Sequence, residues 1–279
     1  MNALNKLFQV AAVQMVSAAS IDKNLARAEQ LIADAVHQGA ALVALPEYFC
    51  FMGHRDADKL EFKEAPGHGI IQDFLAGQAR KHGIWLVGGS LPLQTEEAAR
   101  IYNSSFVMAP DGMPVGRYDK IHLFGFRKGE ESYDESVSIK PGEPQPKVVQ
   151  LPFGRVGLSI CYDLRFPELY RAMGEVELIV VPSAFTYTTG SAHWEVLLRA
   201  RAIENQCYVL APAQGGRHEN GRRTWGHSML VDPWGEVAAC LPEGEGVVLG
   251  EIDSARLDEV RLSLPALKHR TICITETNS

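Results

Sequence analysis

The stretch VGLSICYDLRFPE at positions 156–168 decides the fold and points to the chemistry. Residues 156–160 are a short, continuous apolar run, which is typical of a strand covered on both faces. Pro167 follows soon after, and proline is favoured in the first turn of a helix. The stretch therefore predicts a buried strand, a sharp turn that carries Cys161, and a helix over residues 168–173.

The same alternation continues along the rest of the chain. The other short apolar runs predict strands over residues 8–15, 41–45, 84–88, 104–108, 178–181, 208–211 and 228–231. Apolar residues at helical spacing predict helices over residues 24–37, 70–82 and 194–205. Strands and helices in alternation indicate an α/β layered fold. Because neither a linker nor an internal repeat divides the chain, we expect a single domain over residues 1–279.

Composition and charge exclude several classes of protein. Hydrophobic residues make up 46% and charged residues 22% of the chain, as in ordinary globular proteins. The net charge of -7 provides no basic surface for nucleic acid. No apolar run reaches the roughly 18 residues that a membrane span requires. We therefore expect a cytoplasmic protein that binds neither nucleic acid nor membrane.

The distribution of cysteine and histidine argues against disulfide bonds and bound metal. The 5 cysteines are scattered, and no two of them form a CxxC pair. The 9 histidines include no HxH or HExxH spacing. We therefore expect no metal site. We also expect no organic cofactor.

Reactive side chains follow or flank the expected strands. Ligands of α/β folds bind beyond the carboxyl ends of strands. Glu47 follows one apolar run, Cys161 follows another, and Lys120 precedes the irregular stretch of residues 124–147. A long irregular stretch often forms a wall or a lid of an active site. A thiol on a strand-to-helix turn has the context of a nucleophile elbow, in which the next N–H, here that of Tyr162, points at a developing oxyanion.

Each residue taken alone also has an ordinary structural interpretation. A lone cysteine in a strand is most often a packing residue. Lys120 beside Asp119 is compatible with a surface ion pair. His122 and His193 leave open a Cys–His hydrolase, although structural roles are favoured for both. Only the combination of carboxylate, ammonium and thiol favours catalysis.

Three motifs resemble those of the nitrilase superfamily of carbon–nitrogen hydrolases. They are LPEYF at 45–49, YDKIHLF at 118–124 and ICYDLRFPELYR at 160–171. Residues 182–209 and 226–235 are also similar to that superfamily. Within it, the chain is most similar to the branch of deaminated glutathione amidases and omega-amidases. The resemblance implies a four-layer αββα sandwich that forms a homodimer or a higher homo-oligomer.

The resemblance also implies roles for individual residues. Glu47 is expected to be the general base, Lys120 the cationic stabiliser and Cys161 the nucleophile. A second glutamate belongs in the loop after the lysine, and Glu135 matches that position. The neighbouring acids stay open as alternatives: Glu130, Glu131 and Asp134.

The expected function is a cysteine-dependent amidase that converts a small linear amide to a carboxylic acid and ammonia through a thioester. The resemblance suggests deaminated glutathione or a related 2-oxo acid ω-amide as substrate. A nitrilase or an N-carbamoyl-amide hydrolase with the same three residues is the alternative, and a catalytically silent scaffold is a third.

Aromatic and basic residues near the motifs are candidates for binding the substrate. The aromatic side chains that we expect to narrow the pocket are Phe49, Phe51, Tyr162 and Phe185. An arginine is suited to binding a carboxylate in a bidentate manner. The expected site residue is Arg217, with Arg222 and Arg223 as alternatives.

Overall fold

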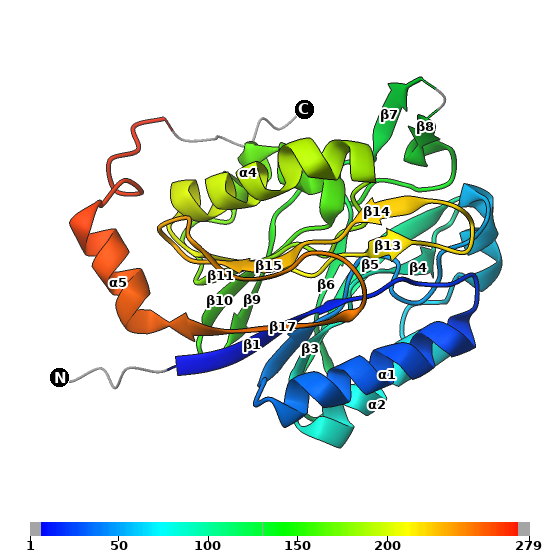
Figure 1. Ribbon diagram of the computed structural model, residues 1–279, viewed down its shortest axis with the longest axis horizontal. Helices are drawn as coiled ribbons and strands as arrows, with labels where there is room; N and C mark the ends of the chain where they lie inside the picture. The colour runs from blue at the N-terminus through cyan, green and yellow to red at the C-terminus, as the bar shows by residue number, and fades with distance from the viewer. Residues whose placement is uncertain (1–6, 130, 273–279) are drawn as a thin grey trace.

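The computed structural model describes residues 7–129 and 131–272 and contains two large β-sheets between layers of helices (Figure 1). The first sheet has seven strands in the order β17-β1-β2-β3-β5-β4, with β6 paired to β5. The bounds are β1 (Leu7–Gln14), β2 (Leu42–Ala44), β3 (Trp85–Val87), β4 (Leu91–Gln94), β5 (Ile101–Met108), β6 (Pro114–Asp119) and β17 (Gly246–Asp253). Strands β1, β2 and β3 are parallel, with Ala11 opposite Val43 and Val43 opposite Leu86.

The second sheet has six strands in the order β16-β15-β12-β11-β10-β9. The bounds are β9 (Lys147–Leu151), β10 (Gly154–Leu158), β11 (Leu178–Val180), β12 (Tyr208–Ala211), β15 (Ser228–Val231) and β16 (Val237–Leu241). Strands β10, β11 and β12 are parallel. Two small hairpins lie outside the large sheets: β7 (Gly125–Lys128) with β8 (Glu131–Asp134), and β13 (Gly215–Arg217) with β14 (Arg223–Trp225).

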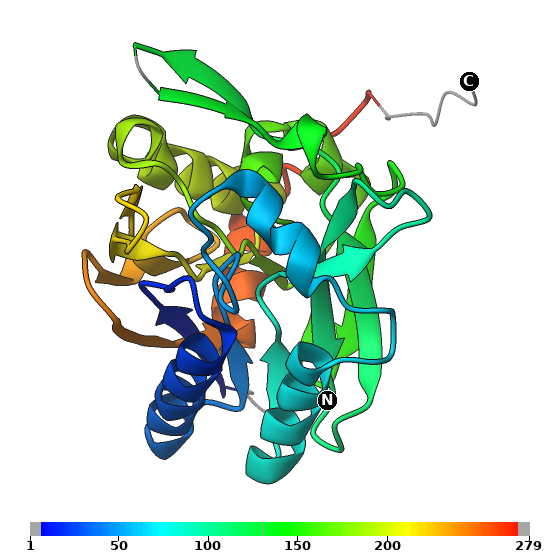
Figure 2. The ribbon, with the colours of Figure 1, turned by 90° about the vertical axis from the view of Figure 1, so that its right-hand side faces the viewer.

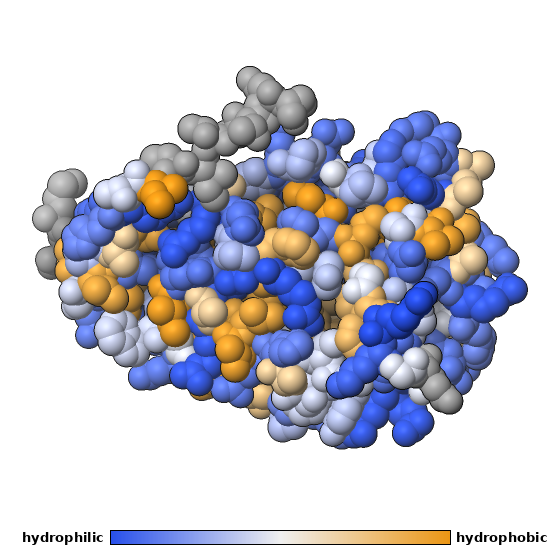
Figure 3. All heavy atoms as spheres, turned by 90° about the horizontal axis from the view of Figure 1, so that it is seen from above, coloured by the Kyte–Doolittle hydropathy of each residue, from blue (hydrophilic) through white to orange (hydrophobic). Residues whose placement is uncertain are grey.

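Helices cover the outer face of each sheet. Helices α1 (Ile21–His37) and α2 (Ile70–His82) pack on the first sheet, and α3 (Pro167–Ala172) and α4 (Tyr187–Asn205) belong to the second (Figure 1). Helix α5 (Ser254–Ser263) follows β17. The outer surface on the side of α4 carries hydrophobic side chains among hydrophilic ones (Figure 3). Over the part of the chain that the structure describes, no helix is both long enough and apolar enough to cross a membrane.

Strand β1 shows why the expected strands are apolar without alternation. Val10 and Ala12 contribute to the core between the two sheets, whereas Ala11 and Val13 belong to the core beneath α1 and α2. Successive side chains of a strand point to opposite faces, so both faces of β1 are covered by protein. The four-layer αββα sandwich is thereby confirmed.

The predicted elements are found at their expected places in the chain, with three main differences. Helix α1 begins at Ile21 rather than at residue 24, because the side chain of Ser20 accepts a hydrogen bond from the Lys23 N–H and caps the earlier turn. Helix α4 begins at Tyr187 rather than at residue 194, because the side chain of Thr186 accepts a hydrogen bond from the Thr189 N–H and caps the earlier turn. The stretch over residues 124–147 is more regular than expected, since it contains the β7–β8 hairpin and a short 3₁₀ helix at Glu135–Val137. This hairpin projects from the body of the molecule near one end of α4 (Figure 2).

Candidate active site

Three charged side chains meet at one end of the two sheets. Lys120 follows β6, Glu47 follows β2, and Glu135 begins the 3₁₀ helix after β8. The Lys120 Nζ lies 2.9 Å from Glu47 Oε1 and 2.8 Å from Glu135 Oε2. Lys120 and Glu47 are each only 1% exposed, and Glu135 is 8% exposed. The structure therefore brings together the predicted ammonium and both predicted carboxylates, with almost no contact with solvent.

Both carboxylates are held by further donors. Asn103 Nδ2 donates to Glu47 Oε1 at 2.9 Å. The Tyr48 hydroxyl donates to Glu135 Oε1 at 2.8 Å, and the Phe124 N–H donates to Glu135 Oε2 at 2.7 Å. Buried charges are stable only when they are paired and hydrogen-bonded. These bonds fix the orientation of each carboxylate around the ammonium.

The charges set the protonation states of Lys120 and Glu135. Burial alone raises the pKa of Glu135, but the positive charges of Lys120 and Lys59 outweigh burial and lower it below its ordinary value. Burial opposes the charged form of Lys120, yet the negative charges of Glu135 and Glu47 raise its pKa well above the usual range. The ammonium and the Glu135 carboxylate are therefore both ionised at neutral pH.

Cys161 lies on a sharp turn at the end of the second sheet. Its φ of 49° is in the left-handed region, which is unusual for a residue other than glycine and is concentrated at functional sites. Its N–H donates to the Pro182 carbonyl at 2.9 Å, which holds the turn against the neighbouring strand. The expected elbow is present, and Cys161 is 7% exposed.

The environment of the Cys161 thiol favours the protonated form. Burial and the negative charge of Glu47 raise the pKa of the thiol, whereas the Lys120 charge and the Ala184 N–H act in the opposite direction. The protonated thiol can thus act as the acid and the neighbouring Glu47 carboxylate as the base. The arrangement can move a proton from sulfur to carboxylate and can stabilise negative charge beside an ammonium group.

Asp163 joins the Cys161 turn to the segment that carries Lys120. Its side chain is fully buried and accepts hydrogen bonds from the Ile160 N–H at 2.8 Å and the Tyr118 hydroxyl at 2.7 Å. The same carboxylate contacts the His122 N–H at 3.0 Å and the His122 Nδ1 at 2.8 Å. Because Tyr118 and His122 flank Lys120, Asp163 sets the position of the ammonium relative to the thiol.

The two candidate histidines have structural partners. His122 contacts Asp163 and stacks on Phe166 with ring centroids 3.7 Å apart. His193 Nδ1 lies 3.2 Å from the Arg165 guanidinium. These contacts favour the structural interpretation over a Cys–His pair.

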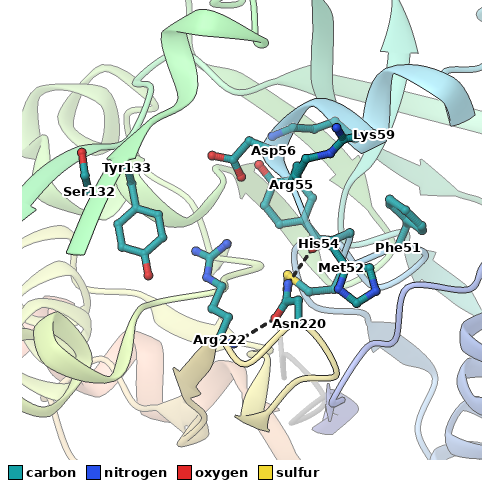
Figure 4. A pocket seen from close by; sticks show the side chains of 12 residues that line it. Phe51, Met52, His54, Arg55, Asp56, Lys59, Ser132, Tyr133, Asn220 and Arg222 are labelled. Carbon is teal, nitrogen blue, oxygen red and sulfur yellow. Dashed lines mark hydrogen bonds between the residues drawn. The ribbon is translucent and has the colours of Figure 1, made fainter. Parts of the chain in front are cut away.

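Two cavities adjoin these residues. The inner cavity is lined by Glu47, Lys120, Glu135 and Cys161, and its volume of about 10 Å³ is close to the least that can hold one water molecule. The outer cavity has a volume of about 330 Å³ and is shown in Figure 4. Arg222 lines both cavities and so marks where they adjoin.

The predicted substrate-binding residues are only partly placed at these cavities. Tyr162 and Phe185 line the inner cavity. Phe49 does not: it is fully buried and stacks with Phe74 at a centroid distance of 6.4 Å, so its role is corrected to core packing. Arg217 is also corrected, because it is exposed at the end of β13 and lines neither the inner nor the outer cavity.

The alternatives to Glu135 are engaged elsewhere or not described. Glu131 Oε1 accepts a hydrogen bond from Thr188, and Asp134 accepts from the Ser136 N–H. Glu130 lies outside the described residues. Glu135 is therefore the acid of this group that the structure places against Lys120.

Several residues of the site were missed by sequence reasoning. Asn103 lies within an apolar strand, and only its polarity there signals a partner. Asp163 belongs to the motif at residues 160–171, but its position in that motif does not indicate the four hydrogen-bonding contacts of its carboxylate. Tyr48 and Lys59 are recognisable only in the folded structure. Across the residues with described positions, no group of three or more His, Cys, Asp and Glu side chains is arranged to hold a metal ion.

Comparisons with known proteins agree with this geometry. A profile described as Carbon-nitrogen hydrolase matches residues 9–262. The deaminated glutathione amidase of Synechocystis is 44% identical over 270 residues, which cover 95% of this chain and 98% of that protein. The chain belongs to the carbon–nitrogen hydrolase family. It is accordingly a hydrolase that acts on carbon–nitrogen bonds and a cysteine amidase of that family.

Solved structures of this family superpose closely on the chain. The crystal structure of the NitFhit protein of Caenorhabditis elegans is 40% identical with a TM-score of 0.88. The match covers 96% of this chain but only 66% of NitFhit. The structure of Saccharomyces cerevisiae Nit3, described as a member of branch 10 of the nitrilase superfamily, is 31% identical with a TM-score of 0.86 and covers 98% of this chain and 99% of Nit3.

Replacing Asp163 tests its positioning role in this carbon–nitrogen hydrolase. Asp163→Asn replaces one carboxylate oxygen with an NH₂ group. At least one of the groups that donate to Asp163 then loses its acceptor. We expect the free energy of unfolding to fall by about 1–3 kcal/mol. We also expect slower alkylation of Cys161 and a lower kcat, because the thiol and the ammonium shift apart. Denaturant titration measures the stability, and alkylation kinetics measure the reactivity of Cys161.

The control is Glu168→Gln, at an exposed position on α3, which should change neither the stability nor the alkylation rate. Wild-type alkylation kinetics in Asp163→Asn would contradict the positioning role of Asp163.

Removing the Lys120 charge should invert the pH dependence of stability. In the wild type the pKa of Glu135 is lowered, so its contribution is present above the ordinary carboxyl pKa and is lost as the pH falls through the lowered value. Lys120→Met leaves Glu47 and Glu135 buried without the cation, which costs about 3–5 kcal/mol. Burial of Glu135 is then opposed mainly by the charge of Lys59 alone, so the pKa of Glu135 rises and this variant should be more stable at pH 5.5 than at pH 8.

The matched double variant separates stability from catalysis. Lys120→Met combined with Glu135→Gln should regain part of the lost stability but remain inactive. Thermal unfolding across this pH range, with an assay of amide hydrolysis, gives both readouts. If Lys120→Met kept the wild-type pH dependence of stability, the buried ion pairs would not have the importance assigned to them.

Proposed function

We propose that this enzyme hydrolyses amides through a thioester on Cys161, with Glu47 as general base and Lys120 as stabiliser of the oxyanion. The observation that carries the proposal is the buried ammonium of Lys120, which contacts Glu47 and Glu135 beside the only thiol on a left-handed turn within the described chain. Glu135 holds the ammonium in place. The side chains of Asn103 and Lys120 both donate to Glu47 Oε1, so Oε2 is the oxygen that would take the thiol proton.

The reaction then proceeds in two stages. In the first, sulfur attacks the amide carbon while Glu47 takes the thiol proton, and Lys120 with the Tyr162 N–H stabilises the oxyanion. The carbon–nitrogen bond breaks as Glu47 returns the proton to nitrogen. In the second stage, Glu47 removes a proton from water, the hydroxide attacks the thioester, and the acid leaves as the carbon–sulfur bond breaks. Cys161 is protonated again at the end.

We propose an amide with a 2-oxo acid end, deaminated glutathione or a related ω-amide, as the substrate. The support comes from the Synechocystis relative named deaminated glutathione amidase, which is 44% identical to this chain. A primary amide would release ammonia, whereas deaminated glutathione, a substituted amide, would release an amine. In both cases the acyl part carries a carboxylate.

Selective alkylation tests the assignment of the nucleophile. Burial raises the pKa values of Cys50 and Cys207, and neither of these buried thiols lines the inner cavity. Cys240 is exposed. Because Glu47 takes the Cys161 proton during attack and the Lys120 ammonium lies beside it, we expect one equivalent of iodoacetamide to modify Cys161 first and abolish hydrolysis, while Cys240 reacts more slowly. Peptide mass spectrometry identifies the modified thiol, and the control Cys240→Ser should keep full activity. Near-wild-type turnover by Cys161→Ala would refute the mechanism.

We also propose that the enzyme is a homodimer that buries the outer face of α4. Val196 and Ile203 are exposed apolar residues on this helix, and further hydrophobic side chains lie among hydrophilic ones on the face seen in Figure 3. We expect light scattering to give twice the chain mass of 30.7 kDa and Val196→Lys to give a monomer. Leu262→Lys, on α5, is the control and should stay dimeric; a monomeric wild type would refute the proposal.

We further propose that the enzyme is located in the cytoplasm. The described cysteines Cys50, Cys161, Cys207 and Cys240 are free, as thiols are in a reducing compartment. Cell fractionation tests this, and recovery of the enzyme outside the cytoplasmic fraction would refute it.

A further inference from the structure

The outer cavity contains two cationic side chains that form no ion pair with a carboxylate of the described residues. Neither Lys59 nor Arg222 forms an ion pair with any described carboxylate. Arg55 lines the same cavity, but its charge is paired with Asp58 at 3.0 Å. Asp56 is the one acidic residue in the lining and makes no ion pair with Lys59 among the described contacts. Counted over its described lining residues, the cavity therefore has an excess of positive charge.

Lys59 is an unusual residue to find enclosed. It is 91% buried in the 3₁₀ helix Asp56–Phe62, with its Nζ 5.2 Å from the centre of the Tyr48 ring. Burial lowers the pKa of Lys59, despite the opposing attraction of Glu135 and Asp56. An enclosed ammonium is stabilised by an anion placed next to it. Through Tyr48, which bonds to Glu135, this ammonium lies one side chain away from the candidate active site.

Arg222 is held in place from its backbone while its guanidinium remains available. The Arg222 N–H donates to Asn220 Oδ1 at 2.9 Å, and Asn220 Nδ2 donates to the Gly53 carbonyl at 2.6 Å. The guanidinium lies 5.0 Å from the centre of the Tyr133 ring and points into the cavity (Figure 4). Its Nε is buried with no hydrogen-bond partner. A buried donor without a partner is unfavourable until a ligand supplies an acceptor.

We propose that Lys59 and Arg222 bind a carboxylate of the substrate in the outer cavity and thereby select amides that carry an anionic end. This inference rests on the proposed amidase function and names the residues that determine its specificity. Arg222 lines both cavities, so a molecule bound to it extends naturally toward Cys161. A volume of about 330 Å³ lies at the lower end of the range for small-molecule sites.

The other two arginines of this region are unsuited to the role. Arg223 pairs with Glu243 at 3.2 Å, and its guanidinium covers the Tyr187 ring at 3.8 Å. Arg217 is exposed and outside both cavities. Arg217→Gln is therefore a matched control, since it removes a nearby positive charge without changing the outer cavity.

Two amides of equal chain length provide the kinetic test. Glutaramate ends in a carboxylate, and pentanamide ends in a methyl group at the same position. We expect wild-type enzyme to prefer glutaramate in kcat/KM. Arg222→Gln and Lys59→Met should each reduce the ratio of the two kcat/KM values by about 10- to 100-fold, which is the usual effect of one charged hydrogen bond. Lys59→Arg should largely restore the ratio, and Arg217→Gln should leave it at the wild-type value.

A binding measurement keeps this inference separate from the amidase proposal. Calorimetric titration of glutarate into Cys161→Ser should show one site, which is lost when Arg222→Gln is added to the same protein. If glutarate binds but the wild type hydrolyses no amide, the amidase proposal fails while the anion site stands. If both amides lose the same factor in Arg222→Gln and Lys59→Met, or if glutarate does not bind, the anion site is refuted although hydrolysis continues.

Discussion

The ammonium of Lys120, enclosed between the carboxylates of Glu47 and Glu135, is the interaction on which the rest of the site depends. Each charge would be strongly unfavourable in this environment by itself, and the three are tolerated because they compensate one another. They come from the end of β2, the end of β6 and the 3₁₀ helix that follows β8. The charges are satisfied only when the segment after β8 packs against the sheets, so the site is complete only in that arrangement.

The stacking of two sheets explains how distant segments reach each other. Strands β2 and β10 belong to different sheets, yet their carboxyl ends lie at the same end of the sandwich and present Glu47 and Cys161 to a shared space. Asp163 then connects the Cys161 turn to the Lys120 segment through buried hydrogen bonds. The inner cavity is small, with a volume of about 10 Å³, and it holds the reacting groups. The outer cavity beside it supplies the space in which the remainder of a substrate can lie.

The sequence was most informative about elements whose residues are constrained locally. Continuous apolar runs predicted the parallel strands, and strand ends predicted Glu47 and Cys161, because burial on both faces leaves a pattern in the chain itself. The pattern could not show which way a neighbouring side chain turns. Phe49 lies two residues after Glu47 but points into the core. Arg217 is close to Arg222 in sequence, yet only Arg222 enters the cavities. Such placements are decided by packing between segments far apart in the chain.

The proposed thioester on Cys161 is the central claim, and rapid acid quenching followed by peptide mass spectrometry tests it most directly. Enzyme is mixed with saturating amide, quenched at times from milliseconds to seconds, and digested. The account predicts that the peptide containing Cys161 gains the mass of the acyl group before product accumulates, and that this modification disappears when substrate is exhausted. Product formation with unmodified Cys161 at every quench time, or with the acyl group on another residue, would contradict it.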